Sequence, residues 1–425
     1  MSQATRILAA LALGLALGLA CGAWMPGWVE PSAAVAEPIG GLWLDALRMT
    51  IIPLVVSLLI TGIAASADAA RAGRLAGRAV ILFMAVLWTS AILSALLTPA
   101  LLGLWPMPGD SAAVLRAAVE STEQPAATVP TFAQFVRSLV PTNPIAAAAE
   151  DRILPLMFFT AVFAFALTRL PKAPREQLTG FFRAVADTML VIVGWVLRAA
   201  PLGVLALAYI VAARAGASAL ESLGHYVIIV ASVGAVVWFL AWPLAMIGGR
   251  VSFLAFTRAV GPAHAVAIST QSSLASLPAM LRGAETMGVP VAASGVVLPI
   301  AVSLFRATGP AMNLAVAIYV AHWYGVPLTP GVLAAGVVLA ATTTLGAVSL
   351  PGSISFITSI GPVCLAMGVP IDALVLLIAV ETLPDIVRTT GNVSMDMAAT
   401  ATVARRSRFD ESAATEEDRL LAQGA

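Results

Sequence analysis

Long apolar stretches, each bounded by short polar or basic segments, recur along this 425-residue chain. A helix rises about 1.5 Å per residue, so crossing a hydrocarbon core of about 30 Å takes roughly 20 apolar residues. The stretches that reach or approach this length lie at about residues 7–25, 41–66, 78–104, 153–169, 177–213 and 222–247. The pattern therefore predicts an all-α protein that crosses a membrane several times.

After residue 250 the pattern changes, because two apolar stretches, 253–287 and 332–365, are each interrupted near the middle. The interruptions read STQSSLASLP at residues 269–278 and TTTLGAVSLPGS at residues 342–353. Each half is too short to cross a membrane, so two re-entrant helical hairpins are expected. Non-helical backbone at membrane depth needs protein or a water-filled cavity to satisfy its polar groups. The two tips thus indicate a polar interior site, although small residues also allow close helix packing.

The last apolar span, about residues 370–404, carries a polar stripe. At about 100° per residue its members fall on one helix face; they are Glu381, Asp385, Arg388, Asn392 and Asp396. A charge at the bilayer centre costs about 2.5–3.5 kcal/mol or more, so such residues face a cavity or charged partners. The stripe either handles a charged solute or forms an internal ladder of salt bridges between helices.

The chemistry of the stripe suits a small anion. The planar fork of Arg388 can bind a carboxylate with two N–H groups, and Asp385 can accept hydrogen bonds from an ammonium. Asn392 and the N–H groups of the hairpin tips can donate to a second carboxylate. These groups together match an acidic amino acid, aspartate or glutamate.

Composition supports a membrane location: 60% of residues are hydrophobic and 11% are charged, whereas soluble domains are about a quarter charged. The net charge is +1 and the Lys and Arg residues lie in short loops, which argues against a nucleic-acid partner. The two cysteines and three histidines suggest neither a disulfide framework nor a zinc site. No nucleophile, metal cluster or cofactor loop accompanies the paired carboxylates, so we expect no enzyme and no catalytic residues.

Basic loops set the expected orientation. The positive-inside rule places the segments 68–78, 169–175 and 250–258 in the cytoplasm. It places both termini there as well, with residues 409–425 as a cytoplasmic tail. The run 7–24 nears spanning length and is interpreted as an uncleaved first span instead of a signal peptide. We expect a multi-pass protein of a bacterial inner membrane.

Four short motifs are distinctive. They are LRMTIIPL at residues 47–54, VPTNP at 140–144, SSLASLP at 272–278 and DIVRTTGNVSMD at 385–396. With these motifs, spread over nearly the whole chain, the sequence resembles the dicarboxylate/amino acid:cation symporter family, which includes the excitatory amino-acid transporters and their archaeal homologues. The resemblance implies eight transmembrane helices plus two hairpins within residues 1–408, assembled as a homotrimer in the lipid bilayer. It also implies a fixed scaffold at about 7–66 and 145–214, and an elevator-like transport core at about 75–104 and 220–404.

The resemblance also assigns roles in the site. It implies that Arg388 binds the side-chain carboxylate of the substrate, Asp385 and Thr389 its amino group, and Asn392 its main carboxylate. The first hairpin would add contacts from Ser272 and Ser273. The tip of the second hairpin would act as the gate, formed by Leu350, Pro351, Gly352 and Ser353.

The seventh span departs from the family pattern. Where the family has Asn-Met-Asp-Gly-Thr, which coordinates sodium, this chain has FRATG at residues 305–309. The sodium ligands that remain by resemblance are Asn392 and Asp396, with the pair Thr89 and Ser90 in the third span.

Arg306 is the new charge in that span. Its burial requires an acidic partner, with Asp396 and Glu381 as the candidates. We hypothesise that its guanidinium stands near a lost sodium position as a tethered cation. Sodium coupling would then be reduced or absent, and a proton on Glu381 or Asp396 would replace it as coupling ion. The alternative is that Arg306 snorkels from a helix end. No other cofactor is expected.

The expected function is secondary active symport of a small anionic solute, with acidic amino acids first. C4-dicarboxylates and neutral amino acids stay open as substrates. Asp385 would repel a dicarboxylate that lacks an ammonium, whereas Arg306 could bind a second carboxylate if it faces the cavity. Two alternatives belong to functional classes other than carriers: a passive anion channel and a non-transporting sensor, each with the same fold.

Overall fold

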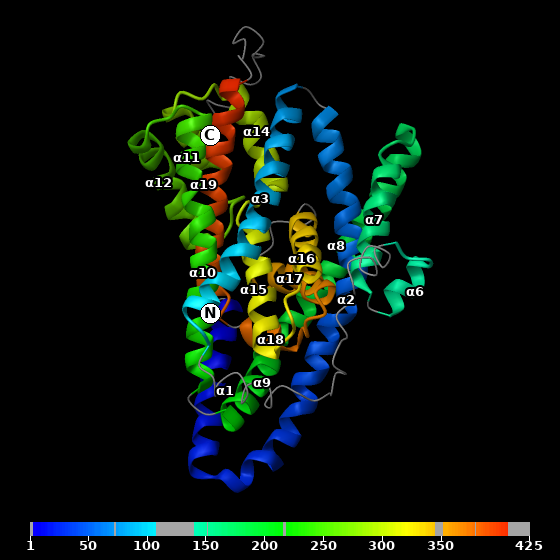
Figure 1. The fold of residues 1–425 in the computed structure, drawn as a ribbon, viewed down its shortest axis with the longest axis vertical. Coiled ribbons are helices and arrows are strands. Elements are labelled where there is room, and N and C mark those ends of the chain that lie inside the picture. Colours follow the sequence, from blue (N-terminus) through cyan, green and yellow to red (C-terminus); the bar gives the residue numbers. More distant parts are fainter. Residues whose placement is uncertain are drawn as a thin grey trace.

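The computed structural model describes residues 3–71, 74–107, 140–150, 152–215, 218–344, 352–378 and 380–406. Over these ranges the chain is helical and contains no strand (Figure 1). The all-α prediction is therefore confirmed for the described part of the chain. Two predicted features, the gate residues Leu350 and Pro351 and the tail 409–425, lie outside the described residues.

A first group of helices from the N-terminal half packs mainly on itself. Its members are α1 (Gln3–Trp24), α2 (Val29–Arg71), α7 (Ile153–Leu167), α8 (Lys172–Arg198) and α9 (Ala200–Ala215), with the short η1 (Pro26–Trp28) and α6 (Pro144–Ala149). Between α1 and α2 the chain axis bends by 119°. The long α2 then runs over much of the height of the molecule (Figure 1).

Small residues let α1 and α9 approach closely. Gly14, Gly18 and Gly22 lie on one face of α1, and a Cβ atom at Gly18 would lie 2.4 Å from the carbonyl oxygen of Tyr209. Helix pairs in membranes associate through such small-residue faces because lipid offers no hydrophobic driving force between helices. The face therefore fixes α1 against α9.

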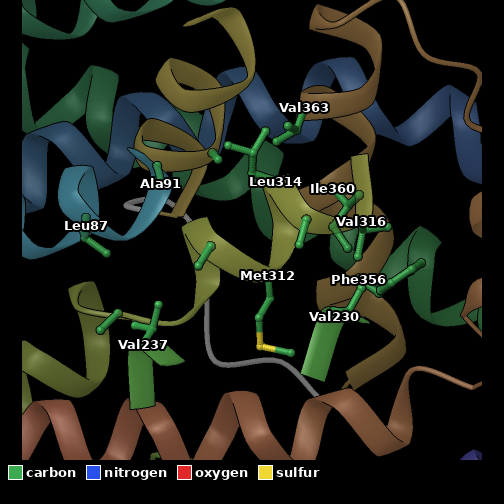
Figure 2. Packing of buried hydrophobic residues seen from close by; sticks show 14 of the residues in the cluster. Leu87, Ala91, Val230, Val237, Met312, Leu314, Val316, Phe356, Ile360 and Val363 are labelled. Carbon is green, nitrogen blue, oxygen red and sulfur yellow. The ribbon is translucent and has the colours of Figure 1, made fainter. Parts of the chain in front are cut away.

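The remaining helices are α3 (Arg74–Leu104), α10 (Ser218–Phe239), α11 (Ala241–Pro243), the π-helical η2 (Leu244–Gly248), α12 (Phe253–Thr270), α13 (Leu277–Thr286), α14 (Val291–Leu304), α15 (Gly309–Tyr324), α16 (Pro330–Thr343), α17 (Gly352–Ala366), α18 (Asp372–Leu377) and α19 (Thr382–Arg406). Among them α15 is buried along nearly its whole length and packs mainly on α3, α10, α16 and α17, whereas α18 packs on α9. Figure 2 shows Met312 of α15 beside Val230 and Val237 of α10. Gly234 of α10 makes room for it, because a Cβ atom there would lie 2.5 Å from the Met312 sulfur.

The two interrupted stretches each contain a pair of helices that pack on each other, α12 with α13 and α16 with α17. The first pair is separated by residues 271–276, where Gln271 has a φ of 51° in the left-handed region. The first break thus lies where the sequence predicts it, whereas most of the second predicted break lies outside the described residues. Their re-entrant course within a membrane stays a prediction.

Two predicted spans are each divided in the structure. The stretch 177–213 comprises α8 and α9, and the stretch 370–404 comprises α18 and α19. A proline within the first turn of the second helix explains each break, Pro201 in α9 and Pro384 in α19. Proline has no N–H for the carbonyl four residues earlier, and its ring clashes with that carbonyl. Glu381 consequently lies in the turn before α19 and not in the helix.

Four helical segments among the described residues are long and apolar enough to cross a membrane. They are Leu75–Leu104, Lys172–Val196, Glu221–Gly248 and Val291–Tyr324, and the bent pair Ala9–Trp24 with Pro26–Trp43 makes a fifth if counted as one span. Several membrane crossings therefore agree with the prediction. The count of eight spans and the division into a fixed scaffold and a moving core stay predictions.

Candidate functional site

Two breaks in the helices bring polar groups into the apolar interior. One is the segment 305–308 between α14 and α15, and the other is the turn before α19. Both lie against the polar face of α19. The charged residues of that turn and of α19 are almost fully buried; the exposed fractions are 2% for Glu381, 6% for Asp385, 5% for Arg388 and 0% for Asp396. Buried charges of this kind must be paired or neutralised.

Arg388 is the centre of the cluster. Its Nη2 donates to Oε1 of Glu381 at 2.6 Å and its Nη1 donates to Oδ1 of Asn313 at 3.1 Å. Its Nε lies 3.7 Å from Oδ1 of Asp385. The hydroxyl of Tyr226 donates to the other oxygen of Glu381 at 3.2 Å. The internal salt-bridge ladder is therefore present, and it uses only part of the five N–H groups of Arg388.

Thr308 positions Asn392. The backbone N–H of Thr308 donates to Oδ1 of Asn392 at 2.9 Å, and its hydroxyl lies 2.8 Å from the same oxygen and 2.9 Å from the carbonyl oxygen of Arg388. With the amide oxygen engaged, the NH₂ group is what Asn392 can offer a ligand. Gly391 permits this approach, since a Cβ atom there would lie 2.5 Å from Cγ2 of Thr308.

Arg306 and Asp396 form the second part of the cluster. Among the described residues, neither carboxylate oxygen of Asp396 has a hydrogen-bond partner, and the side chain is fully buried. The charge of Arg306 interacts favourably with Asp396 and Asp385 and unfavourably with Arg388. Of the two acidic partners that the sequence suggested for Arg306, Asp396 is thus the one near it, while Glu381 pairs with Arg388.

A cavity opens between these groups. Its empty volume is about 230 Å³ when the part open to solvent is included, and its lining residues are Arg306, Gly309, Asn313, Thr344, Ser359, Arg388 and Asn392. Two of them carry a guanidinium and none carries a carboxylate. Asp385 and Thr389 are buried beside this lining but are not part of it. The cavity therefore favours an anion.

Both hairpins border the site. The side-chain amide of Gln271, at the first tip, donates to the carbonyl oxygen of Thr382 at 3.2 Å, which holds that tip against the start of α19. At the same tip Ser273 is 7% exposed, and Ser272 accepts a hydrogen bond from the N–H of Ala275 at 3.2 Å. Neither serine lines the cavity.

The second hairpin contributes two lining residues, Thr344 near the end of α16 and Ser359 on α17. In the sequence they lie on either side of the segment that was predicted to act as the gate. Of its four residues, Gly352 and Ser353 begin α17.

Two of the predicted sodium ligands, Ser90 and Asn392, contact adjacent residues of the segment 305–308. Ser90 is buried and its hydroxyl donates to the carbonyl oxygen of Ala307 at 2.6 Å, whereas Thr89 is exposed and its hydroxyl donates to Ala85 within the same helix. Asn392 is engaged by Thr308, as described above. Sodium binding at these residues stays a prediction.

The sequence reasoning did not assign to the site the polar partners Tyr226, Thr308 and Asn313, or the lining residues Gly309, Thr344 and Ser359. Thr308, Gly309 and Asn313 lie within eight residues of Arg306, so the residues that flank a buried charge would have been the signal. Tyr226 is one of several polar residues of α10, and its position gives no such signal.

Fold and site together define a polytopic helical membrane protein with a cavity that two guanidiniums line among buried charges. Residues 4–406 match the sodium:dicarboxylate symporter family, and the chain belongs to that family. The family resemblance drawn from the motifs is therefore confirmed, and the protein is a transporter and not an enzyme.

The names of individual relatives differ in the solute and in the coupling ion that they state. The chain is 28% identical over 394 residues to the proton/glutamate-aspartate symporter of Escherichia coli (strain K12), covering 90% of this chain and 88% of that protein. It is 29% identical over 370 residues to the proton/sodium-glutamate symport protein of Bacillus subtilis (strain 168), covering 84% and 83%. It is 28% identical over 393 residues to C4-dicarboxylate transport protein 1 of Pseudomonas aeruginosa (strain UCBPP-PA14), covering 88% and 83%.

Proposed function

We propose that this protein is a secondary active symporter for acidic amino acids in a bacterial inner membrane, driven mainly by protons. One observation carries the proposal: Arg388 and Asn392 line a single cavity, with Asp385 held 3.7 Å from Nε of Arg388. A carboxylate would bind the remaining N–H groups of Arg388, and the amide NH₂ of Asn392 would bind the other. The ammonium would lie against Asp385.

Reduced sodium coupling is part of the proposal. Arg306 stands in the segment where the family pattern has sodium ligands, and its charge acts on Asp396. A fixed guanidinium there would repel a sodium ion and neutralise the carboxylate that sodium would need. The name of the Escherichia coli relative, a proton symporter, supports a proton as the alternative coupling ion.

C4-dicarboxylates are the second candidate substrates. Arg306 lines the same cavity as Arg388, so two guanidiniums face one space. Two such groups suit two carboxylates without any ammonium, and the Pseudomonas relative is named for this solute class. A neutral amino acid would offer only one carboxylate to these two guanidiniums.

Uptake by the purified full chain in proteoliposomes tests these proposals. Labelled aspartate should accumulate saturably when a pH gradient is imposed in sodium-free buffer, and unlabelled succinate should compete weakly. Strong competition by succinate would favour the C4-dicarboxylate alternative. Accumulation that requires sodium would overturn the proposed coupling, and flux without accumulation would indicate a channel. The trimeric elevator belongs to the same proposal, and crosslinking of neighbouring protomers in lipid would test the trimer.

The variant Arg306→Met separates the two roles of Arg306. If the guanidinium acts as a tethered cation, this variant should lose transport or acquire sodium dependence. If Arg306 only snorkels, the ion dependence should stay that of the unmodified protein.

A further inference from the structure

One residue that lines the substrate cavity has no side chain. Gly309, the first residue of α15, lines the cavity together with Arg306 and with Thr344 near the end of α16. A Cβ atom at Gly309 would lie 3.3 Å from Cγ2 and 3.5 Å from Oγ1 of Thr344, and 3.6 Å from Cβ of Arg306. Since carbon atoms pack best at about 3.5–4.0 Å, the gap between these groups has room for about one carbon atom.

Neither the backbone nor tight helix packing requires glycine at this position. Gly309 is not among the described glycines with a positive φ, so an alanine could take the same backbone conformation. Gly391 shows the contrasting case, because a Cβ atom there would lie 2.5 Å from Cγ2 of Thr308. The missing side chain at Gly309 therefore leaves space in the cavity instead of permitting a backbone bend or a close helix contact.

Thr344 forms a fixed wall opposite Gly309. Its hydroxyl donates to the carbonyl oxygen of Ala340 at 2.7 Å, one turn earlier in α16. This hydrogen bond holds the side chain in one rotamer and keeps its methyl group toward Gly309. With the hydroxyl hydrogen used in this way, the gap offers mainly carbon atoms to a ligand. It therefore suits a methylene group better than a polar one.

The gap lies on the side of the cavity that Arg306 occupies. Arg306 and Arg388 both line the cavity, none of the lining residues is acidic, and the two guanidiniums repel each other. A carboxylate between them would relieve this repulsion. Aspartate and glutamate carry the same charged groups and differ by one methylene, so the gap can distinguish them only by length.

We propose that Gly309 and Thr344 select the substrate by its length and that the carrier prefers glutamate to aspartate. The inference rests on the proposed function, in which acidic amino acids are the substrates. The additional methylene of glutamate fills the gap, and its side-chain carboxylate lies between Arg388 and Arg306. Aspartate is shorter and binds Arg388 without filling the gap. The longer 2-aminoadipate would meet Cγ2 of Thr344.

Exchange of external labelled aspartate for internal unlabelled aspartate tests the inference in proteoliposomes that contain the full chain. The pH and the sodium concentration are equal on both sides, so the result does not depend on the coupling ion. Unlabelled aspartate, glutamate and 2-aminoadipate compete from outside, and the inhibition constant Ki of each is measured.

Two variants change the gap in opposite directions. Gly309→Ala places a methyl group in it, and Thr344→Ser removes Cγ2 while it keeps the hydroxyl. Gly295→Ala on α14, where no atom lies within 4 Å of the added carbon, is the matched control.

In the unmodified protein the Ki for aspartate should exceed the Ki for glutamate by about tenfold, the effect of one methylene in a fitted pocket. Gly309→Ala should lower this ratio by about tenfold, because its methyl group takes the place of the substrate methylene. Thr344→Ser should lower the Ki for 2-aminoadipate relative to that for glutamate. Gly295→Ala should leave both ratios unchanged.

A preference for aspartate in the unmodified protein would overturn this inference alone. Equal changes of the Ki values for aspartate and glutamate in Gly309→Ala would also overturn it, because they would mean that Gly309 has only a structural role. If labelled succinate exchanges and labelled aspartate does not, the proposed amino-acid substrate is wrong and this inference fails with it.

Discussion

Nη2 of Arg388 and Oε1 of Glu381 lie 2.6 Å apart in a place where both side chains are almost fully buried. Asn313 and Tyr226 complete this pair, one on each partner. A buried ion pair adds little net stability over an apolar pair of the same shape, but removing one partner leaves an uncompensated charge. The stability of the folded protein therefore depends on this pair. A ligand that binds Arg388 or a proton that neutralises Glu381 would change it.

Glu381→Ala should lower the free energy of unfolding by about 3–5 kcal/mol, because the guanidinium stays buried without its carboxylate. Glu381→Gln should lower it less, since an amide oxygen can still accept from Nη2. Thermal unfolding of the purified protein in detergent measures both. Glu285→Ala, at an exposed position on α13, serves as the control and should change the free energy by no more than about 0.5 kcal/mol. Equal stability of Glu381→Ala and the unmodified protein would contradict the role of the pair.

Arg388→Lys should weaken substrate binding while keeping the positive charge. A lysine offers one point of contact where the guanidinium offers a planar fork, so bidentate binding of a carboxylate is lost. We expect the KM for aspartate uptake to rise about tenfold or more, equivalent to about 1.4 kcal/mol or more. Uptake kinetics over a range of aspartate concentrations provide the measurement. An unchanged KM would place the substrate carboxylate elsewhere.

Thr308→Val should impair binding without altering side-chain volume much. The change removes the hydroxyl that lies between Asn392 and the carbonyl of Arg388. Leaving these buried acceptors without the donor costs about 1–3 kcal/mol. The amide of Asn392 should then lose its fixed orientation, and aspartate affinity should fall. Thr308→Ser keeps the hydroxyl and should bind as the unmodified protein does; if both variants bind alike, the hydroxyl has no such role.

The sequence predicts the helical class, the two interrupted stretches and the charged stripe because each leaves a local signal. Apolar runs of spanning length are unambiguous. A charged residue within such a run, such as Arg388 or Asp396, is conspicuous because placing a charge in lipid costs free energy. The motifs that the chain shares with the family also predict the class of transporter. These features need no knowledge of which helices touch.

The partners of those charges could not be predicted in the same way. Tyr226 meets Glu381 only because α10 packs on α19, and no local pattern encodes a contact over 155 residues. The separation of Thr89 from Ser90 does follow from helix geometry, since adjacent residues face about 100° apart. Pro384 likewise marked the break before α19, although the apolar run continues across it.

Gly391→Ala should destabilise the site by steric conflict, and the structure identifies the atoms involved. The new methyl group would lie 2.5 Å from Cγ2 of Thr308 and 3.1 Å from Cβ of Trp238. Overpacking of this kind costs about 1–3 kcal/mol, which thermal unfolding should show as a lower midpoint. Gly295→Ala, where no atom lies within 4 Å of the added carbon, is the matched control and should be neutral or slightly stabilising.

Adding Thr308→Ser to Gly391→Ala isolates the cause, because serine lacks the Cγ2 atom that the new methyl would meet while it keeps the hydroxyl that holds Asn392. The double variant should recover part of the lost stability and most of the aspartate affinity. Full recovery is not expected, since the approach to Trp238 remains. If the double variant is no more stable than Gly391→Ala, the loss of stability arises elsewhere in α19. In that case the close approach of α19 to the segment 305–308 does not limit the packing of the site.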